Sequence, residues 1–286
     1  MSAPISPVPA GVRVRVPAKI NLALCVGAPR ADGFHPLATV YQAVSLFDEV
    51  HAAWGDPGEF TVTVTGEGAA EVPTDDRNLA VRAARLLADR YGEGQPLGVV
   101  LAIHKAIPVA GGLAGGSADG AAALLACADL WALDVSLDQM LSLAAELGSD
   151  VPFALVGGTA LGTGRGEVVV PAMVRGDYWW VVAASTTGLS TPDVYREFDV
   201  LSDGLGLHDP EIPDELMEAL RAHDLEKLAL TVQNDLEAPA LRLRPALAEL
   251  LTAGMDASAL GALLSGSGPT CLFLCRDKGH AQQVVS

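Results

Sequence analysis

The sequence has few cysteines, few positive charges and no long hydrophobic run, and each shortage excludes a class of protein. The four cysteines among 286 residues form no CxxC pair, which argues against a disulfide framework and favours buried, reduced thiols. An apolar run such as Tyr178–Ala184 is far shorter than the roughly 18 residues that span a bilayer. The first residues lack the charged and apolar regions of a signal peptide. We therefore expect a cytoplasmic protein with no membrane segment.

Positive charge is scarce: 18 lysines and arginines face 35 aspartates and glutamates, for a formal charge of −17. Such an excess repels nucleic acids and anionic membranes, so neither is expected as a partner. A phosphate ligand would have to be held locally, by backbone N–H groups, a few placed cations and a metal ion. The six histidines show no zinc-ligand spacing such as HExxH, so no zinc site is expected.

The hydrophobic pattern predicts an α+β fold in two domains. Two strand-like pieces flank Pro17, and a last strand is expected at 270–275. Helices are predicted at 75–92, 117–133, 136–148, 214–230 and 245–253. The glycine-dense, hairpin-like segment Gly157–Glu167 is the best boundary. It divides the chain into a nucleotide-binding domain, residues 1–160, and a smaller domain, residues 161–286.

Four glycines crowd into six positions, 111, 112, 115 and 116, just before a predicted helix. Glycine lets the backbone approach an oxyanion, and the start of a helix offers free N–H groups and the positive end of its dipole. The spacing fits neither GxxxxGK[ST] nor GxGxxG. A tight turn with Ser117 as the helix N-cap needs only one or two glycines, so the pattern favours an anion site.

Three motifs resemble those of the GHMP kinases, the superfamily of galactokinase, homoserine kinase, mevalonate kinase and phosphomevalonate kinase. They are PAKINLAL near the N-terminus, PVAGGLAGGSAD in the centre, and SGSGPT at Ser265–Thr270. PAKINL with DGFH and GSDVPF is also similar to the members that phosphorylate a cytidine diphosphate-linked methylerythritol. The resemblance implies a two-domain GHMP kinase fold, ATP and Mg²⁺ as cofactors, and phosphorylation of the 2-hydroxyl of that small-molecule substrate in the non-mevalonate isoprenoid pathway.

The resemblance also implies the catalytic residues, with Asp150 as base and Lys19 beside it. A neighbouring lysine would keep Asp150 ionised and stabilise charge in the transition state. By local sequence alone, Asp150 serves equally well as an N-cap for the short segment after it. Asn21 lies on the same strand face as Lys19 and is expected to hydrogen-bond the substrate hydroxyl.

Ligand contacts follow from the same resemblance. Phe34 would stack on the cytosine, His35 would contact it, and Thr191 would contact the substrate from the Thr186–Tyr195 segment. Asn78 is placed near the adenine, although a plain helix N-cap is an equal alternative. ATP would be held by Asn78, Lys105 and the loop Pro108, Val109, Ala110, Gly111, Gly112, Leu113, Ala114, Gly115, Gly116, Ser117 and Ala118.

The loop departs from the commonest family pattern at three positions. Ala110 and Ala114 replace frequent glycines, and Ala118 replaces a frequent serine. Alanine tolerates close backbone approach when its φ is negative, so nucleotide binding is expected to persist.

Three alternatives remain open at this point. A mevalonate- or homoserine-type kinase would have no base to stack on Phe34. A non-catalytic nucleotide sensor would need neither Lys19 nor Asp150. An unrelated domain whose glycines only form turns would not contain three motifs in this order. The oligomeric state is left open.

Overall fold

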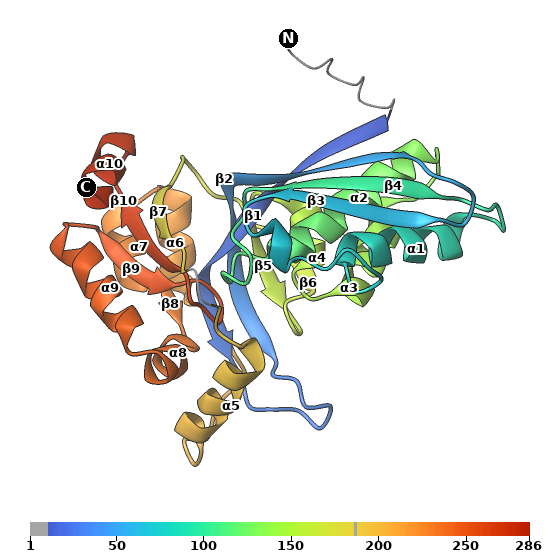
Figure 1. Ribbon diagram of the computed structural model, residues 1–286. Coiled ribbons are helices and arrows are strands. Elements are labelled where there is room, and N and C mark those ends of the chain that lie inside the picture. Colours follow the sequence, from blue (N-terminus) through green and yellow to red (C-terminus); the bar gives the residue numbers. More distant parts are fainter. Residues whose placement is uncertain (1–10, 186–187) are drawn as a thin grey trace, which may run out of the picture. The chain divides into compact units, whose positions relative to one another are not determined.

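The structure is a computed structural model that describes residues 11–185 and 188–286. Figure 1 shows its helices and strands with the labels used below. The described residues form two compact units. Unit 1 contains residues 11–17, 46–107 and 115–155, and unit 2 contains residues 18–45, 108–114 and 156–286.

Unit 1 is a sheet with helices packed on one face. Strand β4 (Val99–Lys105) pairs in parallel with β3 (Phe60–Gly66) and antiparallel with the second half of β2 (Leu37–Trp54). The odd-numbered side chains of β4 are buried and the even-numbered ones are exposed, because successive residues of a strand point to opposite faces. The remaining elements are the short helix η1 (Ala69–Glu71), α1 (Leu79–Tyr91), α2 (Gly115–Leu130), α3 (Leu137–Leu147) and α4 (Val151–Val156).

Helix α2 is buried on nearly all sides, which its alanine- and glycine-rich sequence permits. It packs against α1, α3 and β4. A side chain at Gly120 would meet Leu79 of α1 at 3.3 Å, so the small residue sets how closely these two helices approach. The start of α2 is thereby fixed by its neighbours.

The strands of unit 2 belong to two sheets, a seven-stranded one that also includes β3 and β4 and a three-stranded one. In the first, β1 (Gly11–Val26) ends beside β8 (Gln233–Asn234), while the first half of β2 pairs with β5 (Thr159–Thr163), which pairs with β6 (Val168–Pro171). The second sheet has the antiparallel order β7 (Trp179–Ala183), β10 (Cys271–Cys275) and β9 (Gly261–Leu264). Its helices are α5 (Thr191–Ser202), α6 (Asp214–Ala222), α7 (Leu225–Thr231), α8 (Glu237–Leu243), α9 (Ala246–Asp256) and α10 (Lys278–Val285).

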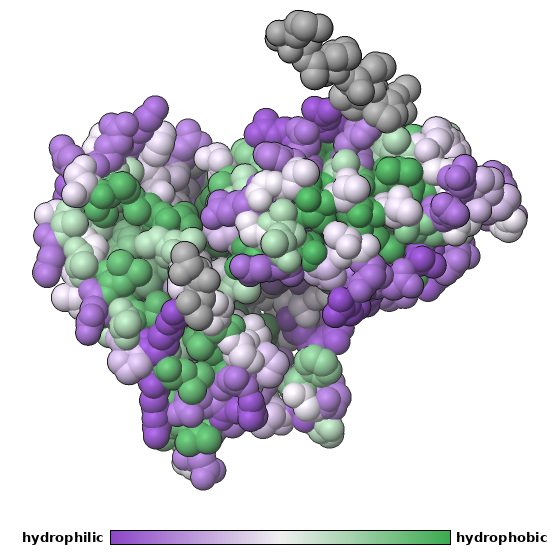
Figure 2. Space-filling model, viewed as in Figure 1, coloured by the Kyte–Doolittle hydropathy of each residue, from purple (hydrophilic) through white to green (hydrophobic). Residues whose placement is uncertain are grey.

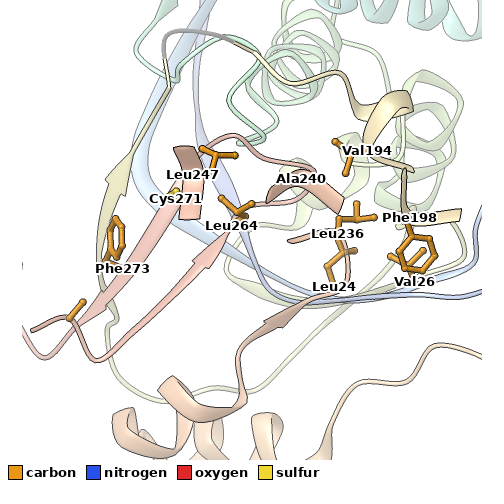
Figure 3. Close-up of a cluster of buried hydrophobic side chains, with 11 residues drawn as sticks. Leu24, Val26, Val194, Phe198, Leu236, Ala240, Leu247, Leu264, Cys271 and Phe273 are labelled. Atoms are coloured by element: carbon orange, nitrogen blue, oxygen red, sulfur yellow. The ribbon is translucent and has the colours of Figure 1, made fainter. Parts of the chain in front are cut away.

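A hydrophobic cluster joins the sheets and helices of unit 2, as Figure 3 shows. Strand β1, helices α5, α8 and α9, and strands β9 and β10 contribute to it. Its members are Leu24, Val26, Val194, Phe198, Leu236, Ala240, Leu247, Ala259, Leu264, Cys271 and Phe273. All four cysteines of the chain are buried and free, which confirms the sequence prediction.

On the face that Figure 2 shows, patches of hydrophobic residues are exposed and hydrophilic residues lie mainly around them. Across residues 11–185 and 188–286, no helix is long and apolar enough to cross a membrane.

Several predicted elements have different bounds in the structure. Strand β1 runs through Pro17 without interruption. Its neighbour β8 pairs only at Ala23 and Leu24, so that edge of β1 is free of a described strand at Pro17, where a missing N–H costs no ladder hydrogen bond. The predicted helix 214–230 is two helices, because His223 adopts a left-handed φ of 55° and ends α6.

The two units also divide the chain differently from a boundary at residue 160. Unit 2 begins its longest segment at residue 156 but also includes residues 18–45 and 108–114. The chain passes from one unit to the other within two long strands and at both ends of the Pro108–Ala114 segment. A single boundary therefore does not describe the division.

Candidate active site

Polar side chains on β1 and β2 form a buried chain of hydrogen bonds in unit 2. The ammonium of Lys19 donates to Oδ1 of Asn21 at 2.8 Å, and Nδ2 of Asn21 donates to Oγ1 of Thr39 at 2.8 Å. Lys19 is only 6% exposed, and its ammonium lies 5.5 Å from the centroid of the Tyr41 ring. The shared face of Lys19 and Asn21 is thus confirmed. Sequence reasoning missed Thr39 and Tyr41. They are two residues apart on β2 and so share one strand face, as Lys19 and Asn21 do on β1.

The first half of the glycine-rich loop is held by its main chain. The backbone N–H of Lys19 donates to the carbonyl of Leu113 at 3.2 Å, and Oγ of Ser265 donates to the carbonyl of Gly112 at 3.2 Å. A side chain at Gly112 would lie 2.5 Å from the carbonyl oxygen of Ser265, and its φ is 78°. Residues of all three motifs therefore meet in unit 2.

The SGSGPT motif forms the turn between β9 and β10 and adjoins two predicted site residues. A Cβ built on Gly266 would lie 3.5 Å from Oδ1 of Asn21 and 3.6 Å from the ammonium of Lys19. The hydroxyls of Ser267 and Thr191 are 2.7 Å apart. Thr191 starts α5, a helix that is not among those predicted from the sequence. Thr186 and Thr187 of the predicted substrate segment lie outside the described residues.

The residues predicted to bind the cytosine lie beside α5. Nδ1 of His35 donates to the carbonyl of Gly27 at 2.8 Å, and its Nε2 lies 3.4 Å from a carboxylate oxygen of Asp199. The ring of Tyr195 is 5.1 Å from the His35 ring. His35 is buried, whereas Phe34 is 51% exposed and is therefore open to a stacking partner.

The guanidinium of Arg165 lies 5.0 Å from the centroid of the Phe34 ring. Sequence reasoning missed this contact, and it also missed Tyr195 and Asp199. The helical spacing of residues 195, 198 and 199 is a signal that points to one face of α5.

The remaining predicted residues belong to unit 1. Asp150 is half-buried on the turn between α3 and α4. Asn78 caps α1: its Oδ1 accepts from the N–H of Ala80 at 2.9 Å, and its Nδ2 donates to the carbonyl of Pro73 at 2.8 Å. The N-cap alternative is thus confirmed, and the adenine contact stays a prediction. So does the pairing of Lys19 with Asp150.

Lys105 is 3% exposed, and its ammonium is bound by two buried carboxylates. It pairs with Asp48 and with Asp119, the latter at 2.6 Å. Burial raises the pKa of Asp119 to about 7; the charge of Asp48 adds to the rise, while Lys105 opposes it. The side chain of Lys105 therefore serves this cluster, and its contact with adenine stays a prediction.

Two parts of the chain match family models: GHMP kinases N terminal domain covers residues 78–158, and GHMP kinases C terminal covers residues 216–286. The 4-diphosphocytidyl-2-C-methyl-D-erythritol kinases of Streptomyces coelicolor and Nocardioides sp. are each 54% identical to this chain, over 96% of it and 91% of the relative. The chain belongs to the GHMP kinase family.

Solved structures agree with this assignment. The crystal structure of 4-(cytidine 5'-diphospho)-2C-methyl-D-erythritol kinase is similar with a TM-score of 0.76 and 34% identity, over 96% of this chain and 93% of that chain. L. major mevalonate kinase in complex with R-mevalonate has a TM-score of 0.76 at 17% identity, over 98% of this chain and 92% of that one, and shows the fold alone.

This GHMP kinase carries two strained alanines in its loop. Ala110 has a φ of 56° and Ala114 a φ of 58°, so the expectation of negative φ at these positions is wrong. The two alanines flank Gly112 and Leu113, whose carbonyls accept hydrogen bonds from Ser265 and Lys19. For an L-residue the left-handed conformation of these alanines costs roughly 1–2 kcal/mol.

The second half of the loop has open space beside its main chain. A Cβ on Gly116 would have no atom within 4 Å, so the main chain there is open to a ligand at the first turn of α2. Within the described ranges, no three His, Cys, Asp or Glu side chains are grouped to hold a metal ion.

Replacing Ala114 with glycine should stabilise this kinase. The substitution relieves the left-handed strain but adds backbone freedom to the unfolded chain, for a net gain of about 0.5–1 kcal/mol. Urea unfolding measures it. Ala253→Gly, at an exposed position in α9, is the matched control and should lose about 1 kcal/mol. A loss of unfolding free energy in both variants would contradict the claim that Ala114 is strained.

Asp119 should make stability fall as pH rises. The unfolded carboxyl loses its proton near its ordinary pKa of 3.8, whereas the folded one keeps it to about 7, so the free energy of unfolding decreases across that interval. Relative to Asp119→Asn, the wild type should lose at most about 4 kcal/mol between about pH 4 and 7. Urea unfolding at several pH values tests this. A difference that stays constant or grows with pH would refute it.

Proposed function

We propose that the chain transfers the γ-phosphoryl group of ATP to the 2-hydroxyl of 4-diphosphocytidyl-2-C-methyl-D-erythritol. The observation that carries the proposal is the 54% identity, over 96% of the chain, to relatives named as kinases of this substrate. The exposed ring of Phe34 beside the buried His35 supports it, because a cytidine substrate needs an aromatic surface and polar groups at its base.

In the proposed reaction Asp150 accepts the proton of the 2-hydroxyl as its oxygen bonds to the γ-phosphorus, and ADP leaves. Phosphoryl transfer depends mainly on positioning and on stabilising charge. Lys19 is suited to the second task because its ammonium is buried and already oriented by Asn21 at 2.8 Å. Bound Mg²⁺ would neutralise charge on the β- and γ-phosphates.

The donor and the acceptor would use different parts of the loop region. The triphosphate would lie along the main chain of Gly115–Ala118, at the start of α2. The acceptor would lie near Asn21 and Thr191, with its cytosine stacked on the face of Phe34 that Arg165 leaves open. These residues support the cytidine substrate over mevalonate or homoserine, which have no base to stack.

The test is ATP consumption with Mg²⁺ and three acceptors: the cytidine-linked substrate, mevalonate and homoserine. Turnover is expected with the first alone. Asp150→Asn should reduce kcat by roughly 10²–10⁴-fold, the usual contribution of a general base, with an unchanged unfolding midpoint. Asp138→Asn, in the exposed first turn of α3, is the matched control and should keep full activity.

Turnover with mevalonate or homoserine would support a kinase activity but refute the proposed cytidine-linked substrate. Full activity in Asp150→Asn would show that Asp150 is not the general base.

A further inference from the structure

The buried cluster of Asp48, Lys105 and Asp119 joins the two places where the glycine-rich loop is attached to unit 1. Strand β4 ends at Lys105, and the loop follows at Pro108. The loop continues into α2, whose first turns contain Asp119. Three side chains, each less than 5% exposed, thus connect the beginning of the loop to its end.

Asp48 binds the beginning of the loop. Its Oδ1 accepts hydrogen bonds from the backbone N–H groups of Ala106 at 2.7 Å and Ile107 at 2.9 Å. Its other oxygen binds the ammonium of Lys105. The strand register explains this position, because Glu49 pairs with His104 and so Asp48 lies opposite Lys105 on the buried face of the sheet.

Lys105 connects this group to the helix. Its ammonium donates to Oδ2 of Asp119 at 2.6 Å. A Cβ on Gly115, the first residue of α2, would lie 3.2 Å from that ammonium and 3.1 Å from the side chain of Ile107. The helix therefore begins close to the lysine, and a side chain at this position would crowd both Lys105 and Ile107.

Burying this charged cluster is unfavourable if its only role is to fill the core. Two carboxylates share one ammonium, and no described group donates to Oδ1 of Asp119. Burying an incompletely paired charge is unfavourable, and apolar residues of similar size often serve stability as well or better. The arrangement does supply a fixed geometry, since each end of the loop is tied to the same ammonium–carboxylate group.

We propose that Asp48, Lys105 and Asp119 are positioning residues that set the spacing of the loop ends and so pre-organise its N–H groups for the triphosphate of ATP. This inference rests on the proposed use of the loop as the ATP site. The positioning effect requires no contact between these three side chains and the nucleotide. They act through the main chain of Ile107 and Gly115, where displacements of about 1 Å weaken function markedly.

The test is steady-state kinetics and nucleotide binding of Asp119→Leu in the full chain. The substitution leaves Lys105 paired with Asp48, so no charge is left unpaired. The KM for ATP and the calorimetric Kd for Mg–ATP should rise about tenfold or more, equivalent to about 1.4 kcal/mol. The KM of the alcohol substrate should stay within about twofold, since a positioning defect confined to the loop leaves the acceptor site intact.

Two further variants separate positioning from stability. Asp119→Asn keeps an oxygen that accepts from Lys105, so it should restore most of the ATP affinity. Asp129→Leu, at an exposed position near the other end of α2, is the matched control and should leave both KM values unchanged. If Asp119→Leu does not fold, Asp119→Asn carries the test with an expected two- to fourfold rise in Kd.

Unchanged ATP affinity in folded Asp119→Leu would overturn the inference, and so would an equal rise in both KM values. The proposed function fails separately. If wild-type protein binds Mg–ATP but does not phosphorylate the cytidine-linked substrate, the loss of ATP affinity in Asp119→Leu still supports positioning.

Discussion

Main-chain contacts hold the Pro108–Ala114 segment, and the rest of the site depends on them. The carbonyls of Gly112 and Leu113 accept hydrogen bonds from Ser265 and Lys19 at 3.2 Å each. A Cβ on Gly112 would lie 2.5 Å from the carbonyl oxygen of Ser265, so a residue without a side chain is needed where the three motifs meet. Ala114 takes a glycine-like φ of 58° to stay in place.

The same constraint explains how a chain with a formal charge of −17 can use a polyanion. Lys105, which lies just before the loop, is already paired with two aspartates. Backbone N–H groups and the dipole of α2 supply positive potential locally, without a basic surface. Lys19 adds one buried charge, so binding relies on placement more than on net charge.

Much of this was predictable from the sequence, and the failures have physical causes. The motif order predicted the family, and strand alternation placed Asn21 with Lys19. The same alternation puts Lys105 on the buried face of β4, but its partner Asp48 depends on a strand register that no local pattern reveals. Helix α5 was missed, although Pro192 in its first turn is a start signal. The positive φ of Ala110 and Ala114 runs against the local propensity of alanine, so no signal in the sequence predicts it.

Hydrogen–deuterium exchange of the loop amides tests the central claim most directly, namely that the loop main chain holds the triphosphate. The wild-type protein would be compared with and without a non-hydrolysable ATP analogue and Mg²⁺. The account predicts slower exchange at the amides of Gly112–Ala118 on nucleotide binding, with no change in α9. Bound nucleotide with unchanged exchange across this segment would contradict it.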